Sequence, residues 1–147
     1  MLQMKNIDHV GIRISDPQRS VAFYELLGFE LVADGGFDQG HPLVLLHPCG
    51  ININLLGPAT ARQDENILMD VDEKYPGITH FAIKMESAED TEAFVTANNI
   101  AITGRRSFEG TETIFIRDPD RNVLELVGPG PSVATLITKH VNEQSTE

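Results

Sequence analysis

Short runs of alternating apolar and polar residues recur along the 147-residue chain. Residues 7–14 alternate and are rich in Ile and Val, which predicts a half-buried strand. Asp16 and Pro17 then provide a capping side chain followed by a proline suited to the first turn of a helix. The helix that follows carries apolar residues at core spacing and ends at Gly28. The chain is therefore expected to open with a strand and then a helix.

The same criteria predict seven further strands and a second helix. The helix covers residues 87–98 and begins at Ser87, with Asp90 three positions later in an arrangement similar to a capping box. A long polar connection, residues 57–77, separates the halves, and connections of this length are often functional or linkers. We expect the first part of the tail after residue 130 to be helical and its end to fray. The predicted strands are 29–33, 43–46, 51–56, 78–85, 100–103, 113–117 and 123–127.

The two halves of the chain repeat one pattern at a constant shift. His80 follows His9 at the same spacing at which Glu125 follows Asn54, since 80 − 9 = 125 − 54 = 71. Repetition at one shift without gaps indicates a duplicated unit. Each half reads β-α-β-β-β. The sequence therefore predicts an α+β fold made of two tandem βαβββ modules, whose sheets pair or face each other about a pseudo-twofold axis.

Length and composition limit the possible class of protein. We expect a single domain over residues 1–147, with module one at about 6–58, a connection at 59–77, module two at about 78–129 and a tail at 130–147. The net charge of −11 argues against nucleic acid or an anionic membrane as a partner. The one cysteine excludes an intrachain disulfide and fits a reducing compartment. With no 18-residue apolar run and no signal-peptide pattern, we expect a soluble, cytoplasmic protein.

Alternation places a set of polar side chains on the sheet face opposite the aliphatic one. Glu125 interrupts an apolar strand, and a buried carboxylate is costly unless it is paired or bound to a cation. A polar sheet face is ordinary, and a lone strand histidine is more often structural than a ligand. However, the repeat puts His9 and His80 at equivalent positions, and two histidines with one carboxylate form a facial triad for a divalent metal. The polar face carries His9, Arg13, Asn52, Asn54, His80, Lys84 and Glu125.

Several motifs together resemble the vicinal oxygen chelate superfamily over residues 6–129. They are Asp8-His9-Val10, Asp16-Pro17 with Phe23-Tyr24 and Leu27-Gly28-Phe29, Thr79-His80-Phe81, and Arg117-Asp118-Pro119-Asp120-Arg121-Asn122 with Leu124-Glu125-Leu126. This superfamily includes glyoxalase I, extradiol dioxygenases, fosfomycin-resistance thiol transferases, methylmalonyl-CoA epimerase and bleomycin-binding proteins. The resemblance implies sheets that form a half-open barrel around a metal site, and it carries the metal ligands over to His9, His80 and Glu125.

The resemblance also implies an enzyme that acts on a small oxygenated metabolite chelated through two neighbouring oxygens. A glyoxalase I-like lyase or isomerase is the first expectation, with Glu125 as the catalytic proton shuttle. An extradiol ring-cleaving dioxygenase is the alternative, and a bleomycin-resistance-type binding protein is the non-enzymatic one. One divalent ion is expected, and Fe, Mn, Ni, Zn and Co are not distinguished. The substrate stays open.

The position equivalent to Glu125 in module one weakens the simple glyoxalase interpretation. Glyoxalase I has Glu there and the epimerase has Gln, whereas this chain has Asn54, a poor neutral ligand. Arg13 is placed like an arginine of glyoxalase I that holds a glutathione carboxylate, although a sheet-edge or dimer contact would explain it equally well. Arg13, Asn54 and Lys84 are predicted to bind substrate. Single chains of this size in the superfamily usually pair modules between subunits, which implies a homodimer.

Overall fold

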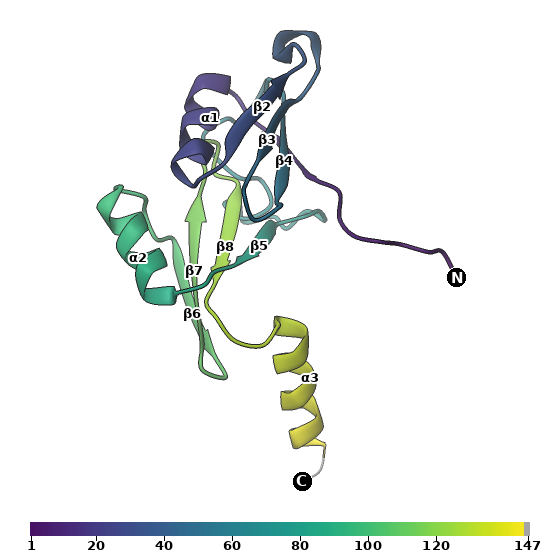
Figure 1. The fold of residues 1–147 in the computed structure, drawn as a ribbon, viewed down its shortest axis with the longest axis vertical. Helices are drawn as coiled ribbons and strands as arrows, with labels where there is room; N and C mark the ends of the chain where they lie inside the picture. Colours follow the sequence, from purple (N-terminus) through teal and green to yellow (C-terminus); the bar gives the residue numbers. More distant parts are fainter. Residues whose placement is uncertain (146–147) are drawn as a thin grey trace. The chain divides into compact units, whose positions relative to one another are not determined.

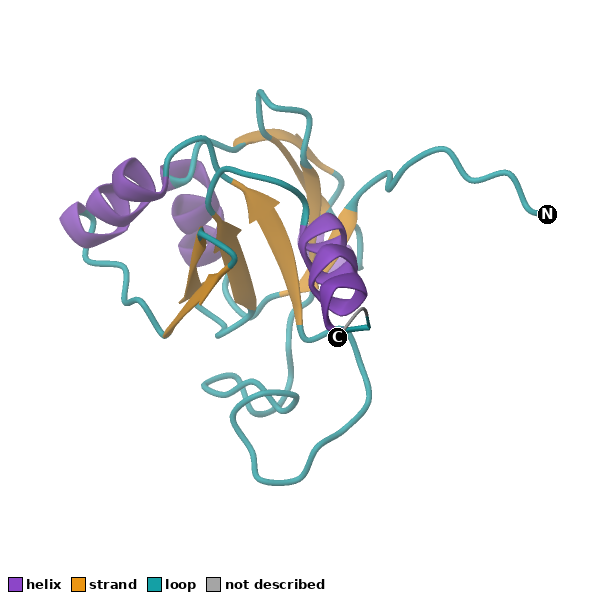
Figure 2. Ribbon diagram, turned by 90° about the horizontal axis from the view of Figure 1, so that it is seen from below, coloured by secondary structure: helices purple, strands orange, loops and turns teal. Residues whose placement is uncertain are grey.

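The computed structural model describes residues 1–145, and these divide into two compact units. Unit 1 comprises Met1–Thr79 together with Asp118–Asn122, and unit 2 comprises His80–Arg117 together with Val123–Glu147. Each unit contains one four-stranded mixed sheet. The long connection between the modules contains turns and bends and is drawn as loop in Figure 2.

Unit 1 contains the first βαβββ module. Its sheet has the order β1-β4-β3-β2, with β1 parallel to β4 and the other pairs antiparallel. Helix α1 packs against the sheet beside β2 (Figure 1). The elements are β1 Val10–Arg13, α1 Pro17–Leu26, β2 Glu30–Asp34, the 3-10 helix Phe37–Gln39, β3 Leu43–Leu46 and β4 Asn52–Leu56.

Unit 2 repeats this arrangement and adds a helix. Its sheet has the order β5-β8-β7-β6, again with one parallel pair, β5 with β8. Helix α2 packs beside β7, and α3 follows β8 after a short connection (Figure 1). The elements are β5 His80–Lys84, α2 Ala88–Ala97, β6 Gly104–Phe108, β7 Thr111–Arg117, β8 Val123–Val127 and α3 Val133–Gln144.

The structure confirms the internal repeat and the α+β fold class. The bounds of α2 and β8 are those of α1 and β4 moved by the shift found in the sequence, since 88 − 17 = 123 − 52 = 71. The strand register shifts equally: Val10 pairs with Ile53, and Phe81 pairs with Leu124. Both helices begin as predicted, with a side chain of Asp16 or Ser87 accepting a hydrogen bond from the backbone N–H three residues later. The predicted half-open barrel around a metal concerns both units together and stays a prediction.

One predicted strand is wrong. Residues 100–103 are not a strand, and the strand in that place is β6, Gly104–Phe108. Its register is set by a two-residue hairpin turn, because Phe108 pairs with Thr111 across Glu109 and Gly110. Both turn residues have positive φ, 48° and 78°, as the favoured tight hairpin turn requires. The β2–β3 connection in unit 1 is longer, so the repeat does not extend to this hairpin.

The aliphatic faces of the strands form the two cores. Ile53 and Leu55 of β4 are fully buried in unit 1, and Leu124 is fully buried in unit 2. All five residues of β8 are buried, including Glu125. Burying a Leu or Ile side chain contributes about 1.5–3 kcal/mol, so these faces hold each helix on its sheet and leave the opposite faces to polar residues.

A buried polar cluster holds the turn that precedes β8 within unit 1. Asp118, only 3% exposed, accepts hydrogen bonds from the Tyr24 hydroxyl (2.9 Å) and from the backbone N–H of Asp120 (2.9 Å). It also accepts from the backbone N–H and the side-chain amide of Asn122, at 2.8 and 2.9 Å. Asp120 in turn accepts from the Ser20 hydroxyl at 3.3 Å. The turn between β7 and β8 is therefore bonded to α1.

Because Tyr24 is buried in this cluster, we expect the free energy of unfolding to fall at alkaline pH. Burial, together with the neighbouring Asp118, raises the pKa of Tyr24 well above its ordinary value of 10.0. A raised folded-state pKa contributes stability that is present below the unfolded-state value and lost as pH rises past it. Wild type should lose stability above about pH 10, and Tyr24→Phe should lose less over the same interval. Urea unfolding at pH 8 to 11 measures the difference.

Tyr75→Phe is the matched control, because Tyr75 is 48% exposed. At pH 8, the free energy of unfolding of Tyr24→Phe should be about 1–3 kcal/mol lower than that of wild type, since the substitution leaves Asp118 without one donor. Parallel pH profiles for wild type and Tyr24→Phe would contradict the assignment.

Candidate functional site

Glu125 lies at the centre of β8 and contacts an imidazole and a guanidinium. Its Oε2 is 2.9 Å from His80 Nε2, and its Oε1 accepts a hydrogen bond from Arg106 Nη2 at 2.7 Å. Glu125 is 4% exposed. The cost of burying this carboxylate is thus offset by a guanidinium and an imidazole. Glu125 is therefore shielded from water and contacts two polar side chains on its sheet face.

Strand order and register bring these three side chains to one face of unit 2. Glu125 pairs with Ala82 of β5 on one side and with Phe115 of β7 on the other. His80 is two residues before Ala82, so it points to the same face from the neighbouring strand. Its ring meets that of Phe115 edge to face, with centroids 6.3 Å apart. Arg106 reaches Glu125 from β6, at the far edge of the sheet.

Lys84, predicted to bind substrate, shares this face at the end of β5. It is exposed, and its ammonium donates a hydrogen bond to the backbone carbonyl of Pro131 at 3.1 Å. The carbonyl of Pro131 lies just before α3, so this contact ties the end of the strand to the segment that starts the helix.

The module-one candidates lie on the corresponding face of unit 1. His9 directly precedes β1, and its Nδ1 is 2.7 Å from Asp8 Oδ2. Asn54 pairs with Gly11 in the parallel β1–β4 ladder, and Arg13 is exposed two residues beyond Gly11. Within residues 1–145, the buried Oδ1 atom of Asn54 has no hydrogen-bond partner. A buried oxygen of this kind is a ready acceptor for a ligand group.

The structure therefore assembles part of the predicted metal set. His80 and Glu125 meet in unit 2, whereas His9 belongs to unit 1. In the part of the chain that the structure describes, no group of three or more His, Cys, Asp or Glu side chains could hold a metal ion. The role of His9 as third ligand stays a prediction.

Sequence reasoning missed Arg106. The strand was expected at residues 100–103, which left the two arginines at 105 and 106 outside any element. The pair Glu109-Gly110 between two strand-like runs is the signal that would have placed β6 at 104–108. Alternation along that strand then separates Arg105 from Arg106, one on each face.

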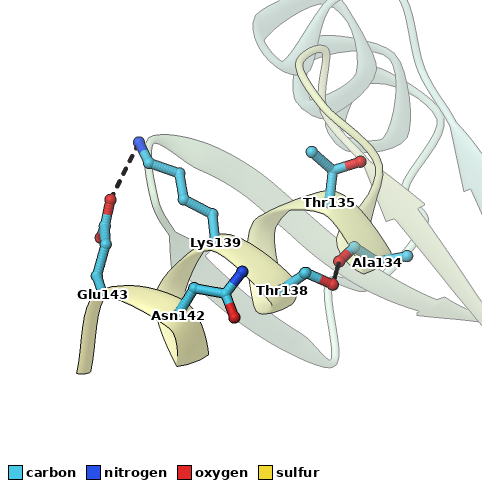
Figure 3. A pocket seen from close by; sticks show the side chains of 6 residues that line it. All are labelled: Ala134, Thr135, Thr138, Lys139, Asn142 and Glu143. Carbon is cyan, nitrogen blue, oxygen red and sulfur yellow. Dashed lines mark hydrogen bonds and ion pairs between the residues drawn. The ribbon is translucent and has the colours of Figure 1, made fainter. Parts of the chain in front are cut away.

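A surface hollow on α3 is not part of this site (Figure 3). All of its lining residues come from one helix, and two of them form an ion pair, Lys139 Nζ to Glu143 Oε1 at 3.7 Å. Specific sites use polar groups that converge on a concave pocket, so one side of a helix is a poor candidate. The lining residues are Ala134, Thr135, Thr138, Lys139, Asn142 and Glu143.

Comparison with known families identifies the superfamily of the chain. A family model described as the glyoxalase/bleomycin resistance protein/dioxygenase superfamily matches residues 6–126, which include His9, His80 and Glu125. The chain belongs to this superfamily. Members of the glyoxalase superfamily bind small molecules and commonly carry a divalent metal, and they include both enzymes and non-enzymatic binding proteins. No curated protein is significantly similar to the chain in sequence.

Solved structures of the glyoxalase superfamily share the fold. A glyoxalase family protein from Enterococcus faecalis is 29% identical, covers 84% of this chain and 97% of its own, and has a TM-score of 0.64. A lactoylglutathione lyase from Agrobacterium tumefaciens is 19% identical, with 85% and 94% covered and a TM-score of 0.62. An antibiotic binding protein from Streptomyces sp. CB03234 is 19% identical, covers 88% of this chain and 100% of its own, and has a TM-score of 0.65. At 19% identity, the lyase and the antibiotic binding protein show the fold alone.

Helices α1, α2 and α3 contain 10, 10 and 12 residues. None within residues 1–145 is both long enough and apolar enough to cross a bilayer.

Proposed function

We propose that this protein is a metal-dependent enzyme of the glyoxalase I type, a lyase or isomerase acting on a small oxygenated metabolite. The observation that carries the proposal is the His80–Glu125 pair, with Nε2 and Oε2 2.9 Å apart on one sheet face of unit 2. Imidazole and carboxylate are the ligand types of a two-histidine, one-carboxylate metal site. His9 is the proposed third ligand.

Two observations in unit 1 fit such a metal site. His9 is hydrogen-bonded through Nδ1 to Asp8, which leaves Nε2 as the atom that would bind the ion. Metal-binding histidines commonly have their other ring nitrogen held by a carboxylate in this way. The buried Oδ1 of Asn54, without a partner among the described residues, is a suitable acceptor for a substrate hydroxyl.

Each residue of the proposed site has a chemical role. A bound divalent ion would supply Lewis-acid polarisation of two neighbouring substrate oxygens. Glu125 would take a proton at one carboxylate oxygen and return it to the substrate, and the buried strand holds that carboxylate in place. Arg13 and Lys84 would bind negatively charged groups of the substrate through charge-assisted hydrogen bonds.

Two alternative functions have support from specific residues. The neutral Asn54 leaves three candidate protein ligands, which also suits an extradiol-type dioxygenase; iron with aerobic catechol turnover would identify it. The contact of Arg106 with Glu125 satisfies the carboxylate without metal, which suits a bleomycin-resistance-type binding protein.

We further propose that the protein is cytoplasmic and forms a homodimer. Sedimentation of the purified protein measures the number of chains in the assembly.

Metal analysis tests the proposal. Protein purified without chelator should carry about one divalent ion per chain, whereas His80→Ala should carry almost none, because it removes one of three ligands. His140→Ala is the matched control: His140 is 41% exposed on α3 and pairs with Glu109. Absence of metal from wild type, or equal metal in wild type and His80→Ala, would contradict the proposal.

A further inference from the structure

Arg106 is hydrogen-bonded to the carboxylate of Glu125, which the proposed function assigns to a metal. Its guanidinium lies 2.7 Å from Glu125 Oε1, and its side chain is 48% exposed, whereas that of Glu125 is 5% exposed. The arginine is therefore the partner that can move, because water can solvate it elsewhere. Glu125 is held in a buried strand and cannot follow it.

The neighbouring arginine has a different and separate partner. Arg105 makes two contacts with Glu92 of α2, Nη1 to Oε2 at 2.8 Å and Nη2 to Oε1 at 2.5 Å. Arg105 thus faces the helix side of the sheet, and Arg106 faces the side of His80 and Glu125. Two adjacent residues of the same type, one on each face, provide a matched pair for experiment.

The face that contains Arg106 is basic, although the chain is acidic overall. Alternation along β7 places Arg117 on the same face as Phe115, and alternation along β5 places Lys84 on the same face as His80. Arg106, Arg117 and Lys84 thus share one sheet face with Glu125, in a chain whose net charge is −11. Such local charge favours an anionic ligand.

We propose that Arg106 competes with the metal for Glu125 and, once displaced, binds a carboxylate of the substrate beside the metal. This inference rests on the proposed metal site and names the class of substrate: a small molecule with a carboxylate near its two chelating oxygens. A guanidinium and a dication repel each other when they share one carboxylate. The planar fork of arginine binds a carboxylate through two parallel hydrogen bonds. Metal and anionic substrate should consequently each strengthen the binding of the other.

The first experiment measures metal affinity directly. Full-length wild type, Arg106→Gln and Arg105→Gln are titrated with Co²⁺ in competition with a metallochromic chelator. Arg106→Gln should bind Co²⁺ about tenfold more tightly than wild type, within the range typical of coupled sites. Arg105→Gln should bind like wild type, because Arg105 contacts Glu92 on the other face.

The second experiment tests the carboxylate. Butyrohydroxamate and succinate monohydroxamate carry the same two chelating oxygens, and the second has a carboxylate in place of the terminal methyl group. The Co²⁺-loaded wild type and Arg105→Gln should prefer the carboxylated probe by about tenfold, as one charge-assisted pair allows. Arg106→Gln should lose this preference, which calorimetric titration measures.

The outcomes separate this inference from the proposed function. If wild type binds Co²⁺ and Arg106→Gln binds it equally or more weakly, competition by Arg106 is excluded while the metal site stands. If the preference for the carboxylated probe survives in Arg106→Gln, the substrate contact is excluded. If neither wild type nor Arg106→Gln binds Co²⁺, both the metal site and the inference built on it fail.

Discussion

Replacing Glu125 with glutamine is expected to weaken divalent-metal binding by more than about a hundredfold while the protein stays folded. Loss of an outer partner of a metal ligand typically costs about 10–100-fold in affinity, and Glu125 is proposed as the one anionic ligand itself. Glutamine keeps the shape of the side chain within β8 but removes the charge that holds a dication. Chelator competition on wild type and Glu125→Gln measures the change.

The fold is expected to survive this substitution because the partners of Glu125 reach water. The side chains of Arg106 and His80 are 48% and 38% exposed, so solvent can replace the lost carboxylate. Glu112→Gln is the control, because Glu112 is an exposed glutamate on the neighbouring strand. Unchanged metal affinity in Glu125→Gln, with normal thermal unfolding, would exclude Glu125 as a ligand.

Mixing two variants that have each lost metal binding shows which chain of a dimer supplies His9 to the proposed site. In a homodimer whose sites combine modules from two chains, a mixture of His9→Ala and Glu125→Gln regains metal in one site of each mixed dimer. In a site built by one chain, the mixture regains none. Either result requires that each variant alone loses metal, which each separate titration checks.

Replacing Asp118 with alanine is expected to destabilise the protein by roughly 3 kcal/mol, because each buried donor left unsatisfied costs about 1–3 kcal/mol. The substitution removes the acceptor of four hydrogen bonds, which are donated by the Tyr24 hydroxyl, two backbone N–H groups and the Asn122 amide. Burial raises the pKa of Asp118, so ionised Asp118 itself opposes folding at neutral pH, and its removal offsets part of that cost.

Urea unfolding at pH 7 measures this loss against Asp72→Ala, which removes an exposed aspartate. Because the folded-state pKa of Asp118 is raised, its contribution is greatest in acid and declines as pH rises through that pKa. The difference between wild type and Asp118→Ala should therefore be larger at pH 4 than at pH 7. A loss below about 1 kcal/mol at both pH values would show that water replaces Asp118 in the cluster.

The repeat explains why so much of the fold was predictable. Alternation and capping residues predicted α1, α2, β3 and β8 closely, and the constant shift between the halves assigned them to two equivalent modules. These are local signals, because apolar periodicity and end caps depend on neighbours within a few residues. The one misplaced strand, β6, departs from the repeat because a tight hairpin turn sets its register.

The partners of Glu125 depend on contacts that no local pattern contains. Its pairing with His80 joins two strands that are far apart in sequence, and the repeat alone indicated it. The contact with Arg106 has no equivalent in module one, where residue 35 is a glycine. Arg106 on β6 contacts Glu125 on β8 across the intervening strand β7. This contact depends on the order of the strands in the sheet, which cannot be predicted from periodicity.

The sequence by itself determined the two modules, their helices, and Glu125 as a carboxylate in an apolar strand with His80 as its companion in the predicted site. Only the tertiary structure showed that Glu125 is buried and that it contacts both His80 and Arg106. Burial and side-chain contacts depend on the order and pairing of strands in the sheet. The same holds for Asp118, whose four donors come from both its own turn and α1. A charge buried in a strand can be recognised from sequence, but the groups that neutralise it are found only where the chain folds back on itself.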